Sequence, residues 1–209
     1  MTPATQLAEG LRLLEIDLPA TTQTRLLDYL AVLEKWNRVY QLTALRDTTL
    51  AVSHHLLDSL AVLPFVQSPD LLDVGSGGGM PGIPLAIACP ELRVLLLDSN
   101  SKKAAFLRQA IIELGLTNIA VHCGRVEKFQ PTARFTAIIA RAFSSLADLV
   151  TLSRHLRHTE GRWLAMKGVW PANEIANLPA DVAVRAAHAL HVPGVDGERH
   201  LLVIGNSET

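Results

Sequence analysis

Cysteine, long apolar runs and charge of one sign are all scarce in this 209-residue chain. Its two cysteines, Cys89 and Cys123, are too few for a disulfide framework. No uninterrupted apolar run approaches the length of a membrane span. The N-terminal stretch MTPATQLAEG lacks the basic start and the apolar centre of a secretory signal peptide. We therefore expect a cytoplasmic protein without a membrane partner.

The charge balance also excludes a strong general attraction to polyanions. The chain has 19 Lys and Arg residues against 20 Asp and Glu residues, so its formal net charge is -1. A nucleic acid would therefore have to be met by a local basic patch. No sequence-near group of His, Cys and acidic residues has metal-ligand spacing, so we expect no metal. With 49% hydrophobic residues, the chain can form one sizeable α/β domain with an appendage.

Residues 1–66 show helical patterns. Leucines recur with helical spacing from Leu7 to Leu14 and again from Leu26 to Leu33. Thr21 and Thr22 are candidate N-caps of the second helix. Asp47 is a candidate cap of a third helix, which would carry Leu50, Leu57, Leu60 and Leu63. We expect an N-terminal helical segment over residues 1–66, packed on a second domain over residues 67–209.

From residue 70 onward, short apolar runs alternate with helical patterns. The expected strands cover residues 71–74, 94–97, 119–123, 136–140, 163–166, 182–186 and 201–204. Such alternation indicates a parallel sheet with helices on both faces. A turn-rich stretch, without a crossover helix, joins the last two runs. The pattern therefore predicts an α/β fold whose sheet is mostly parallel, with an antiparallel last strand.

Five glycines lie between residues 75 and 82, directly after the first expected strand. Glycines there let a ligand approach the backbone in the crevice beyond the strand ends, and a glycine-rich turn without a ligand is the alternative. Residues 77–82 match the dinucleotide pattern G-x-G-x-x-G, and Asp98 ends the second expected strand, where an acid can bind a ribose hydroxyl. Taken alone, this pattern indicates an NAD site.

Two details argue against a dinucleotide. The match begins two residues later than the end of the strand requires, and Pro81 has no amide hydrogen where a pyrophosphate would be bound. Asp73, Gly75 and Gly77 instead form D-x-G-x-G, which resembles the first motif of class I S-adenosylmethionine (SAM) methyltransferases. SAM has no phosphate, but it has a ribose diol that suits Asp98. The alternative for Asp98 is that it caps the next helix.

Further blocks carry a closer resemblance. They are WNRVYQLTALRD (36–47), HLLDSL (55–60), LLDVGSGGGMPGIPLAIACP (71–90), LLDSNSKKAAFLRQ (96–109), GRVEKF (124–129), ARAF (140–143), AMKG (165–168) and GERHLLVI (197–204). In this order, over nearly the whole chain, they resemble the RsmG family of bacterial methyltransferases, also called GidB (glucose-inhibited division protein B). The resemblance implies a Rossmann-like class I fold and SAM-dependent methylation of N7 of guanine 527 in 16S ribosomal RNA of the small ribosomal subunit.

The motif and the resemblance together imply a set of cofactor-binding residues: Gly75, Gly77, Met80, Asp98, Val126, Glu127 and Arg141. Arg141 ends the fourth expected strand and is the catalytic candidate. Its guanidinium can bind the carboxylate side of the cofactor, reach the RNA or form a structural ion pair. His55, Asp58 and Ser59 belong to a family-like motif near the crevice, and the sequence assigns them no role.

The implied chemistry needs no general base, because guanine N7 carries a lone pair and no proton. Direct in-line attack then depends on positioning and electrostatics. In agreement, IIARAF (138–143) lacks the N/D-P-P-aromatic motif of exocyclic-amine methylases.

RNA contacts are expected from local basic residues, of which Lys167 and Arg199 with His200 are preferred because they lie at sheet ends. Further candidates, which can equally be solvated surface, are Lys35, Arg38, Arg46, Arg154, His155, Arg157 and His158.

Other functions stay open at this point. A SAM-dependent methyltransferase that acts on another RNA, a small molecule or a protein is the first alternative. An NAD-dependent oxidoreductase and a non-catalytic SAM-binding or assembly protein are the others. No obligate protein partner is evident from the sequence.

Overall fold

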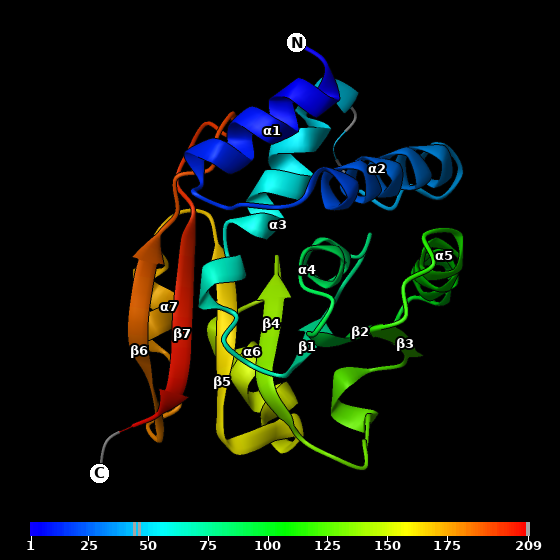
Figure 1. The fold of residues 1–209 in the computed structure, drawn as a ribbon. Coiled ribbons are helices and arrows are strands. Elements are labelled where there is room, and N and C mark those ends of the chain that lie inside the picture. Colours follow the sequence, from blue (N-terminus) through cyan, green and yellow to red (C-terminus); the bar gives the residue numbers. More distant parts are fainter. Residues whose placement is uncertain (44, 46, 208–209) are drawn as a thin grey trace.

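The computed structural model describes residues 1–43, 45 and 47–207 and contains one seven-stranded sheet (Figure 1). The strand order is β3-β2-β1-β4-β5-β7-β6. The strands are β1 (Asp70–Val74), β2 (Arg93–Asp98), β3 (Ile119–Cys123), β4 (Phe135–Arg141), β5 (Arg157–Lys167), β6 (Val182–Ala189) and β7 (His200–Asn206). All seven contain the predicted runs; β5 begins six residues earlier than predicted, and the other ends differ by at most three residues.

Only β7 runs against the direction of the other strands. It pairs antiparallel with both β5 and β6, whereas the pairs from β3 through to β5 are parallel. The connection from β6 to β7 is too short for the crossover that a parallel pair needs, so the chain turns back. The predicted α/β fold with an antiparallel last strand is therefore confirmed.

Helices cover both faces of the sheet, because neighbouring residues of each central strand point to opposite faces. Leu71 of β1 joins a core with α4 (Gly82–Ala88), α5 (Ser101–Glu113) and the N-terminal helices. Leu72 joins a second core with α6 (Leu146–Ser153) and residues beside α7 (Ala172–Ala176). In place of an α-helix, a single 3-10 turn, η4 (Val126–Lys128), precedes β4.

The first two helices form as the leucine spacing predicted, but the predicted caps are wrong. They are α1 (Pro3–Leu13) and α2 (Ala20–Tyr40), and none of the described helices is long and apolar enough for a bilayer span. The α2 helix begins before Thr21 and Thr22, directly after Pro19. Proline fixes its own φ near the helical value, so the helix begins there without a side-chain cap.

The expected third helix is broken into short turns of different pitch. They are η1 (Thr48–Leu50, a 3-10 turn), η2 (Val52–Leu57, a π-helix), α3 (Asp58–Leu60) and η3 (Leu63–Phe65, a 3-10 turn). Asp47 does accept a hydrogen bond from the Thr49 amide, as a cap does. At the end of η2 the Asp58 amide donates to the Ser53 carbonyl, five residues back, which is the hydrogen bond of a π-helix. The leucine pattern therefore predicted correctly that these leucines are buried, but it did not predict the helical pitch.

The N-terminal helices share their core with the sheet. Figure 1 shows α1, α2 and α3 together above the end of β4. Leu26 and Leu33 of α2 are buried in the same core as Leu71 of β1 and Leu96 of β2. The division of the chain between residues 66 and 67 stays a prediction, but this shared core fixes the N-terminal helices against the strand ends.

Asp73, the first residue of the D-x-G-x-G motif, joins β1 to the start of α4. Its Oδ2 accepts a hydrogen bond from the Gly82 amide at 2.9 Å, while Oδ1 is buried without a partner. Gly82 permits this contact, since a Cβ there would lie 2.7 Å from Asp73 Oδ2 and 2.3 Å from Leu96 Cδ2. Burial raises the pKa of the Asp73 carboxyl to about 7, an effect that the Gly82 amide partly opposes.

This pKa predicts a stability that falls with pH. Between about pH 4 and pH 7 the folded protein holds a proton on Asp73 that the unfolded chain releases, so stability decreases as pH rises through this window. We expect Asp73→Asn, which cannot ionise, to remove this decrease and to stabilise the protein above pH 7 by about 1–2 kcal/mol, since its partly unpaired amide offsets some of the gain. Urea unfolding at pH 5 and pH 8 measures the effect.

The exposed Asp28 on α2 supplies the matched control, Asp28→Asn. The prediction is wrong if Asp73→Asn and the wild-type protein lose the same free energy of unfolding between the two pH values.

Candidate active site

The sheet has its topological switch point between β1 and β4. The chain leaves β1 toward β2 on one side and leaves β4 toward β5 on the other. At such a point the connections diverge and leave a crevice beyond the carboxyl ends of the two strands. Gly75 directly follows β1 and Arg141 ends β4, so both predicted residues lie at this crevice.

Two adjoining pockets occupy the crevice and bring all ten predicted site residues together. The larger has a volume of about 620 Å³ and is lined by Gly75, Gly77, Met80, Arg141, Lys167, Arg199 and His200 among others. The smaller, of about 360 Å³, is lined by Gly75, Asp98, Val126 and Glu127 among others. Gly75 and Lys103 line both pockets, so a single elongated ligand that passes over Gly75 can occupy both.

The glycine loop is held by its own hydrogen bonds. Gly75 has φ +74°, in the left-handed region that favours glycine. The Gly75 amide donates to the Leu97 carbonyl, and the Gly77 amide donates to Asp98 Oδ2 at 2.9 Å. The amides of Gly79 and Met80 both donate to the Ser76 carbonyl. These four amides are therefore used by β2 and by the loop itself, and they do not form a cradle for a pyrophosphate.

Tyr29 of α2 also fixes this loop, a contact that the sequence did not reveal. Its hydroxyl donates to the Gly78 carbonyl at 2.6 Å, and burial raises the pKa of the phenol well above its ordinary value. A buried hydroxyl needs such a partner. A residue of the N-terminal segment thus shapes the floor of the larger pocket.

Asp98 is positioned toward the pocket and does not cap α5. Asn100 is the N-cap, and its side chain accepts from the amides of Lys102 and Lys103. Asp98 instead accepts from the amides of Gly77 and Asn100, one to each carboxylate oxygen. Each oxygen has a second lone pair, so the carboxylate can still accept hydrogen bonds from a diol in the smaller pocket.

Val126 and Glu127 differ in their exposure at the other end of the smaller pocket. Val126 is buried against the second core, and Phe143 and Leu152 line the pocket beside it. The Glu127 carboxylate lies 2.6 Å from Arg125 Nε on the surface. The smaller pocket therefore has an apolar wall, a polar rim and the Asp98 carboxylate, a combination that fits an adenosine.

Arg141 forms an ion pair with the buried Asp58, which was the structural alternative for this residue. Its Nη1 lies 3.0 Å from Asp58 Oδ2 and also donates to the His54 carbonyl, while Nη2 lies 3.3 Å from Met80 Sδ. Arg199 Nε donates to the other Asp58 oxygen, also at 3.0 Å. One carboxylate, only 5% exposed, thus holds two guanidinium groups at the edge of the larger pocket.

The neighbours of Asp58 in the motif have their own partners. His55 Nε2 is hydrogen-bonded to Thr43 Oγ1, and burial lowers the pKa of the imidazole to about 4, so the ring is neutral. Ser59 Oγ donates to the His55 carbonyl. His55 lines a separate pocket against α2, and Ser59 is fully buried. Of the three, only Asp58 reaches the predicted site.

Lys167 is less available than its place at the end of β5 suggested. Its ammonium lies 2.7 Å from Glu174 Oε2, and its side chain is 15% exposed. This pairing could not be predicted from the sequence, because Glu174 lies in the short helix α7 that folds back over the strand end. His200 Nδ1 donates to the Gly168 carbonyl at 2.7 Å, which leaves the ring at the pocket wall.

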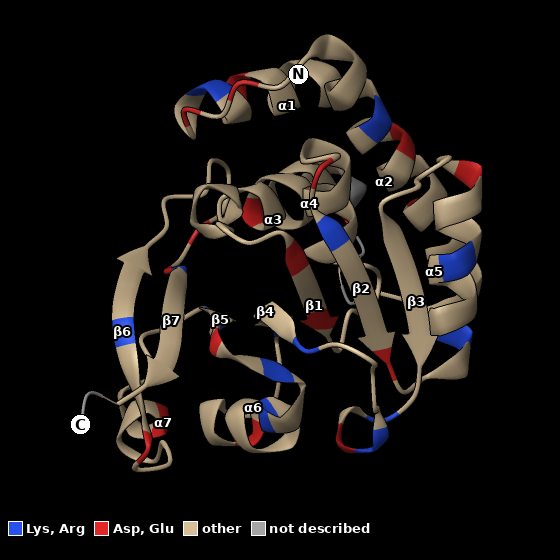
Figure 2. Cartoon of the chain, turned by 60° about the horizontal axis from the view of Figure 1, so that its bottom comes forward, with Lys and Arg blue, Asp and Glu red and all other residues tan. Residues whose placement is uncertain are grey.

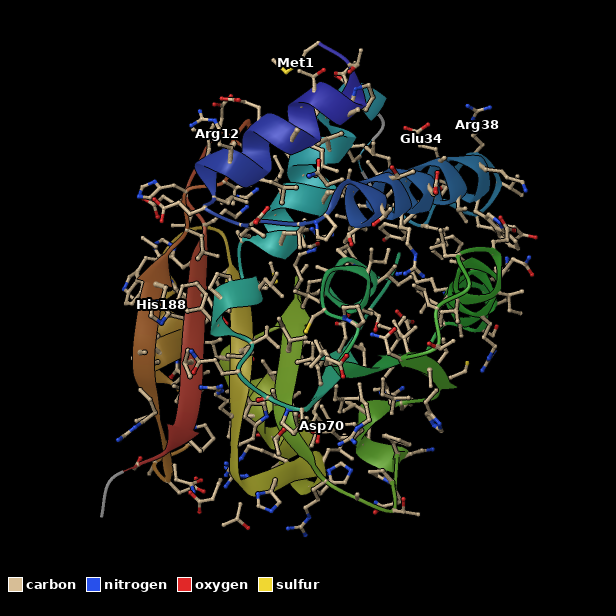
Figure 3. All side chains as sticks on the ribbon, viewed as in Figure 1. Met1, Arg12, Glu34, Arg38, Asp70 and His188 are labelled. Atoms are coloured by element: carbon tan, nitrogen blue, oxygen red, sulfur yellow. The ribbon has the colours of Figure 1, made fainter. Side chains whose placement is uncertain are left out.

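The other basic candidates lie away from the two pockets. Four of them lie at the amino end of β5, opposite the crevice: Arg154, His155, Arg157 and His158. There Arg154 pairs with Asp181. Figure 3 shows Arg38 at the far end of α2, pointing away from the sheet. Arg46 lies outside the described residues.

Acidic and basic residues are interspersed over the elements visible in Figure 2. Among the side chains that the structure describes, no group of three or more His, Cys, Asp or Glu lies close enough to hold a metal ion.

Solved methyltransferase structures share the fold of this chain. TrmN from Thermus thermophilus is 22% identical with a TM-score of 0.59, and the match covers 82% of this chain and 53% of that chain. The ribosomal protein L11 methylase from Lactobacillus delbrueckii is 16% identical with a TM-score of 0.58, covering 78% and 81%. The O-methyltransferase TomG from Streptomyces achromogenes, solved with SAM, is 16% identical with a TM-score of 0.55, covering 86% and 90%. The fold is that of class I SAM-dependent methyltransferases.

Closer relatives identify the family. The family model described as GidB, rRNA small subunit methyltransferase G, matches residues 22–202. Proteins named Ribosomal RNA small subunit methyltransferase G are 55% identical over 200 residues in Laribacter hongkongensis (96% of this chain, 97% of the relative) and 52% identical over 203 residues in Marinobacter nauticus (97% and 95%). The resemblance predicted from the motifs is confirmed, and the chain belongs to the GidB family of rRNA small subunit methyltransferases G.

Proposed function

We propose that this protein transfers the methyl group of SAM to N7 of guanine 527 in bacterial 16S rRNA, within the small ribosomal subunit and therefore in the cytoplasm. The observation that carries the proposal is the pair of pockets joined at Gly75. The smaller pocket has a carboxylate and an apolar wall, while the larger has several cationic side chains. The names of the family relatives support ribosomal RNA as the substrate class.

The residues present fit SAM and do not fit a dinucleotide. In the proposed arrangement Asp98 accepts the ribose hydroxyls, Val126 and Glu127 flank the adenine, and the chain at Gly75 and Gly77 passes under the methionine part. The loop amides that a pyrophosphate would need donate instead to β2 or within the loop, and Pro81 has no amide hydrogen. The NAD alternative is therefore disfavoured.

The reaction asks the protein for position and charge, not for proton transfer. Bound SAM supplies an electrophilic methyl group on a sulfonium. Guanine N7 would form the new bond to the methyl carbon with its own lone pair while the methyl–sulfur bond breaks and S-adenosylhomocysteine leaves. The positive charge would move to the methylated guanine, so no side chain would have to remove a proton first. Arg141, held by Asp58 and beside Met80, is the group that we propose to contact the reacting pair and to orient the guanine.

Arg199, His200 and Lys167 are proposed to meet the RNA around the target nucleotide. Arg199 uses two contacts, to Asp58 and to the Glu198 carbonyl, while a guanidinium offers five N–H donors. It can therefore bind a phosphate without leaving Asp58. Lys167 is neutralised by Glu174 in this structure and has to exchange that partner to bind a phosphate, so Arg199 is the stronger candidate.

The function predicts methylation of one nucleotide. We expect methyl transfer from labelled SAM to small ribosomal subunits taken from a strain that lacks this enzyme, with all label in 7-methylguanosine at position 527. Nucleoside mapping of the product gives the site. Label in another nucleotide contradicts the proposed target. If the protein binds SAM but transfers no methyl group to subunits or to free rRNA, its substrate is a different one.

The proposed role of Asp98 predicts that removing its carboxylate weakens cofactor binding. We expect Asp98→Ala to weaken SAM binding by about 1–3 kcal/mol in calorimetry, because two hydrogen bonds from the diol to a charged acceptor are lost. NAD titrated into the wild-type protein is the comparison. The proposed role of Asp98 is wrong if the variant keeps the wild-type SAM affinity.

The proposed role of Arg199 predicts that removing its charge weakens RNA binding and leaves SAM binding unchanged. We expect Arg199→Gln, which can still donate to Asp58, to weaken binding to rRNA about tenfold and to reduce the salt dependence of binding by about one phosphate contact. The SAM affinity should stay at the wild-type value. Arg108→Gln removes an exposed arginine of α5 and is the matched control. An equal loss of SAM affinity in Arg199→Gln contradicts the assignment to RNA.

A further inference from the structure

The connection from β5 to α7 exposes two apolar side chains beside the larger pocket. Val169 is 77% exposed and Trp170 is 44% exposed. Gly168, just before them, lines the pocket together with Lys167 and His200. Trp170 is neither a member of the two hydrophobic cores nor packed against them, so core packing does not explain its place in the fold.

The Trp170 ring is held in one orientation. It packs against the His200 ring in a T-shaped contact, with centroids 5.4 Å apart and planes at 70°. His200 is in turn fixed by its hydrogen bond to the Gly168 carbonyl. Because Pro171 follows, the backbone of Trp170 is restricted to extended conformations, and the Ala172 amide closes the turn onto the Trp170 carbonyl at 3.1 Å. The exposed ring therefore has little freedom to lose on binding.

The pocket next to the ring favours a polyanion. Lys103, Arg141 and Arg199 line it against the acidic Asp58, and the fourth cation, Lys167, is paired with Glu174. On the side of the ring itself, Glu198 Oε2 accepts from the Trp170 amide at 3.4 Å. Two exposed apolar residues make too small a patch for a stable protein interface. A fixed aromatic ring beside a cationic groove is the combination with which proteins bind unpaired nucleotides, since the base stacks on the ring while its phosphate lies near the cations.

We propose that Trp170, supported by His200, is a stacking platform for one unpaired RNA base next to the target guanine. This inference rests on the proposed function and goes beyond it, because it assigns a binding site for a second nucleotide. An enzyme that draws one base out of a stack leaves the neighbouring base without a partner. Trp170 at the pocket rim replaces the lost stacking surface.

Fluorescence tests the platform without the methylation reaction. The RNA probe is a ten-nucleotide oligoadenylate. Inorganic polyphosphate, which carries negative charge but no bases, is the control ligand. Oligoadenylate should quench the tryptophan emission of the wild-type protein above a background from the two other tryptophans, the buried Trp163 and the partly buried Trp36. We expect Trp170→Ala to lose this quenching. It should also bind oligoadenylate roughly tenfold more weakly, as measured by the fluorescence anisotropy of a labelled strand.

Three comparisons make the result specific. Trp170→Phe keeps an aromatic face and should stay within about threefold of wild-type affinity while its quenching is lost. Val169→Ala truncates the even more exposed apolar neighbour and should change neither signal. Polyphosphate should bind all four proteins alike. In methylation of small subunits, Trp170→Ala should raise KM about tenfold, with kcat and SAM affinity near the wild-type values.

The outcomes separate this proposal from the proposed function. Unchanged oligoadenylate affinity in Trp170→Ala overturns the platform, even where the wild-type protein methylates small subunits. A raised KM without a loss of oligoadenylate affinity also overturns it, because the ring then meets another part of the subunit, such as a ribosomal protein. Oligoadenylate binding that depends on Trp170, in a protein that methylates no ribosomal RNA, supports the platform and contradicts the proposed function.

Discussion

The buried carboxylate of Asp58 is the constraint on which the site depends. A buried charge is costly unless it is paired, and Asp58 is paired twice, with Arg141 at the end of β4 and with Arg199 at the start of β7. These three residues come from the N-terminal segment, the centre of the sheet and its last strand. The ion pairs therefore hold together parts of the chain that could otherwise shift at the crevice, and they leave one uncompensated positive charge beside the pocket.

The N-terminal helices are accordingly part of the site and not only a cover for the sheet. Tyr29 of α2 fixes the glycine loop through the Gly78 carbonyl, while the π-helix Val52–Leu57 leads directly into Asp58. A helix that carries one extra residue per turn is costly in isolation, and such turns are frequent at functional sites. Here the altered pitch accompanies a helix that directs His55 into a separate pocket and Asp58 into the crevice.

Local patterns in the sequence were enough to predict the strands, the fold class and the residues at the strand ends. Gly75, Asp98 and Arg141 could be placed because each follows or ends a strand, and parallel strands bring their carboxyl ends to one edge. The contacts that hold those residues could not be predicted in the same way. Asp58 lies 83 residues before Arg141 and 141 residues before Arg199, and neither separation leaves a periodic signal. The pairing of Lys167 with Glu174 was missed because it depends on how a five-residue helix folds back.

A chain with a net charge of -1 can still present a cationic pocket, because charges act over short distances in salt. Most of its surface has charges of both signs, whereas Lys103, Arg141 and Arg199 converge where three strand ends and a helix start meet. We expect such a surface to attract RNA weakly in general and to concentrate that attraction at one place. In the proposed reaction, which needs no proton transfer, discrimination would come from geometry: the correct nucleotide would be the one whose phosphates and neighbouring base reach the cations and the proposed aromatic platform at the same time.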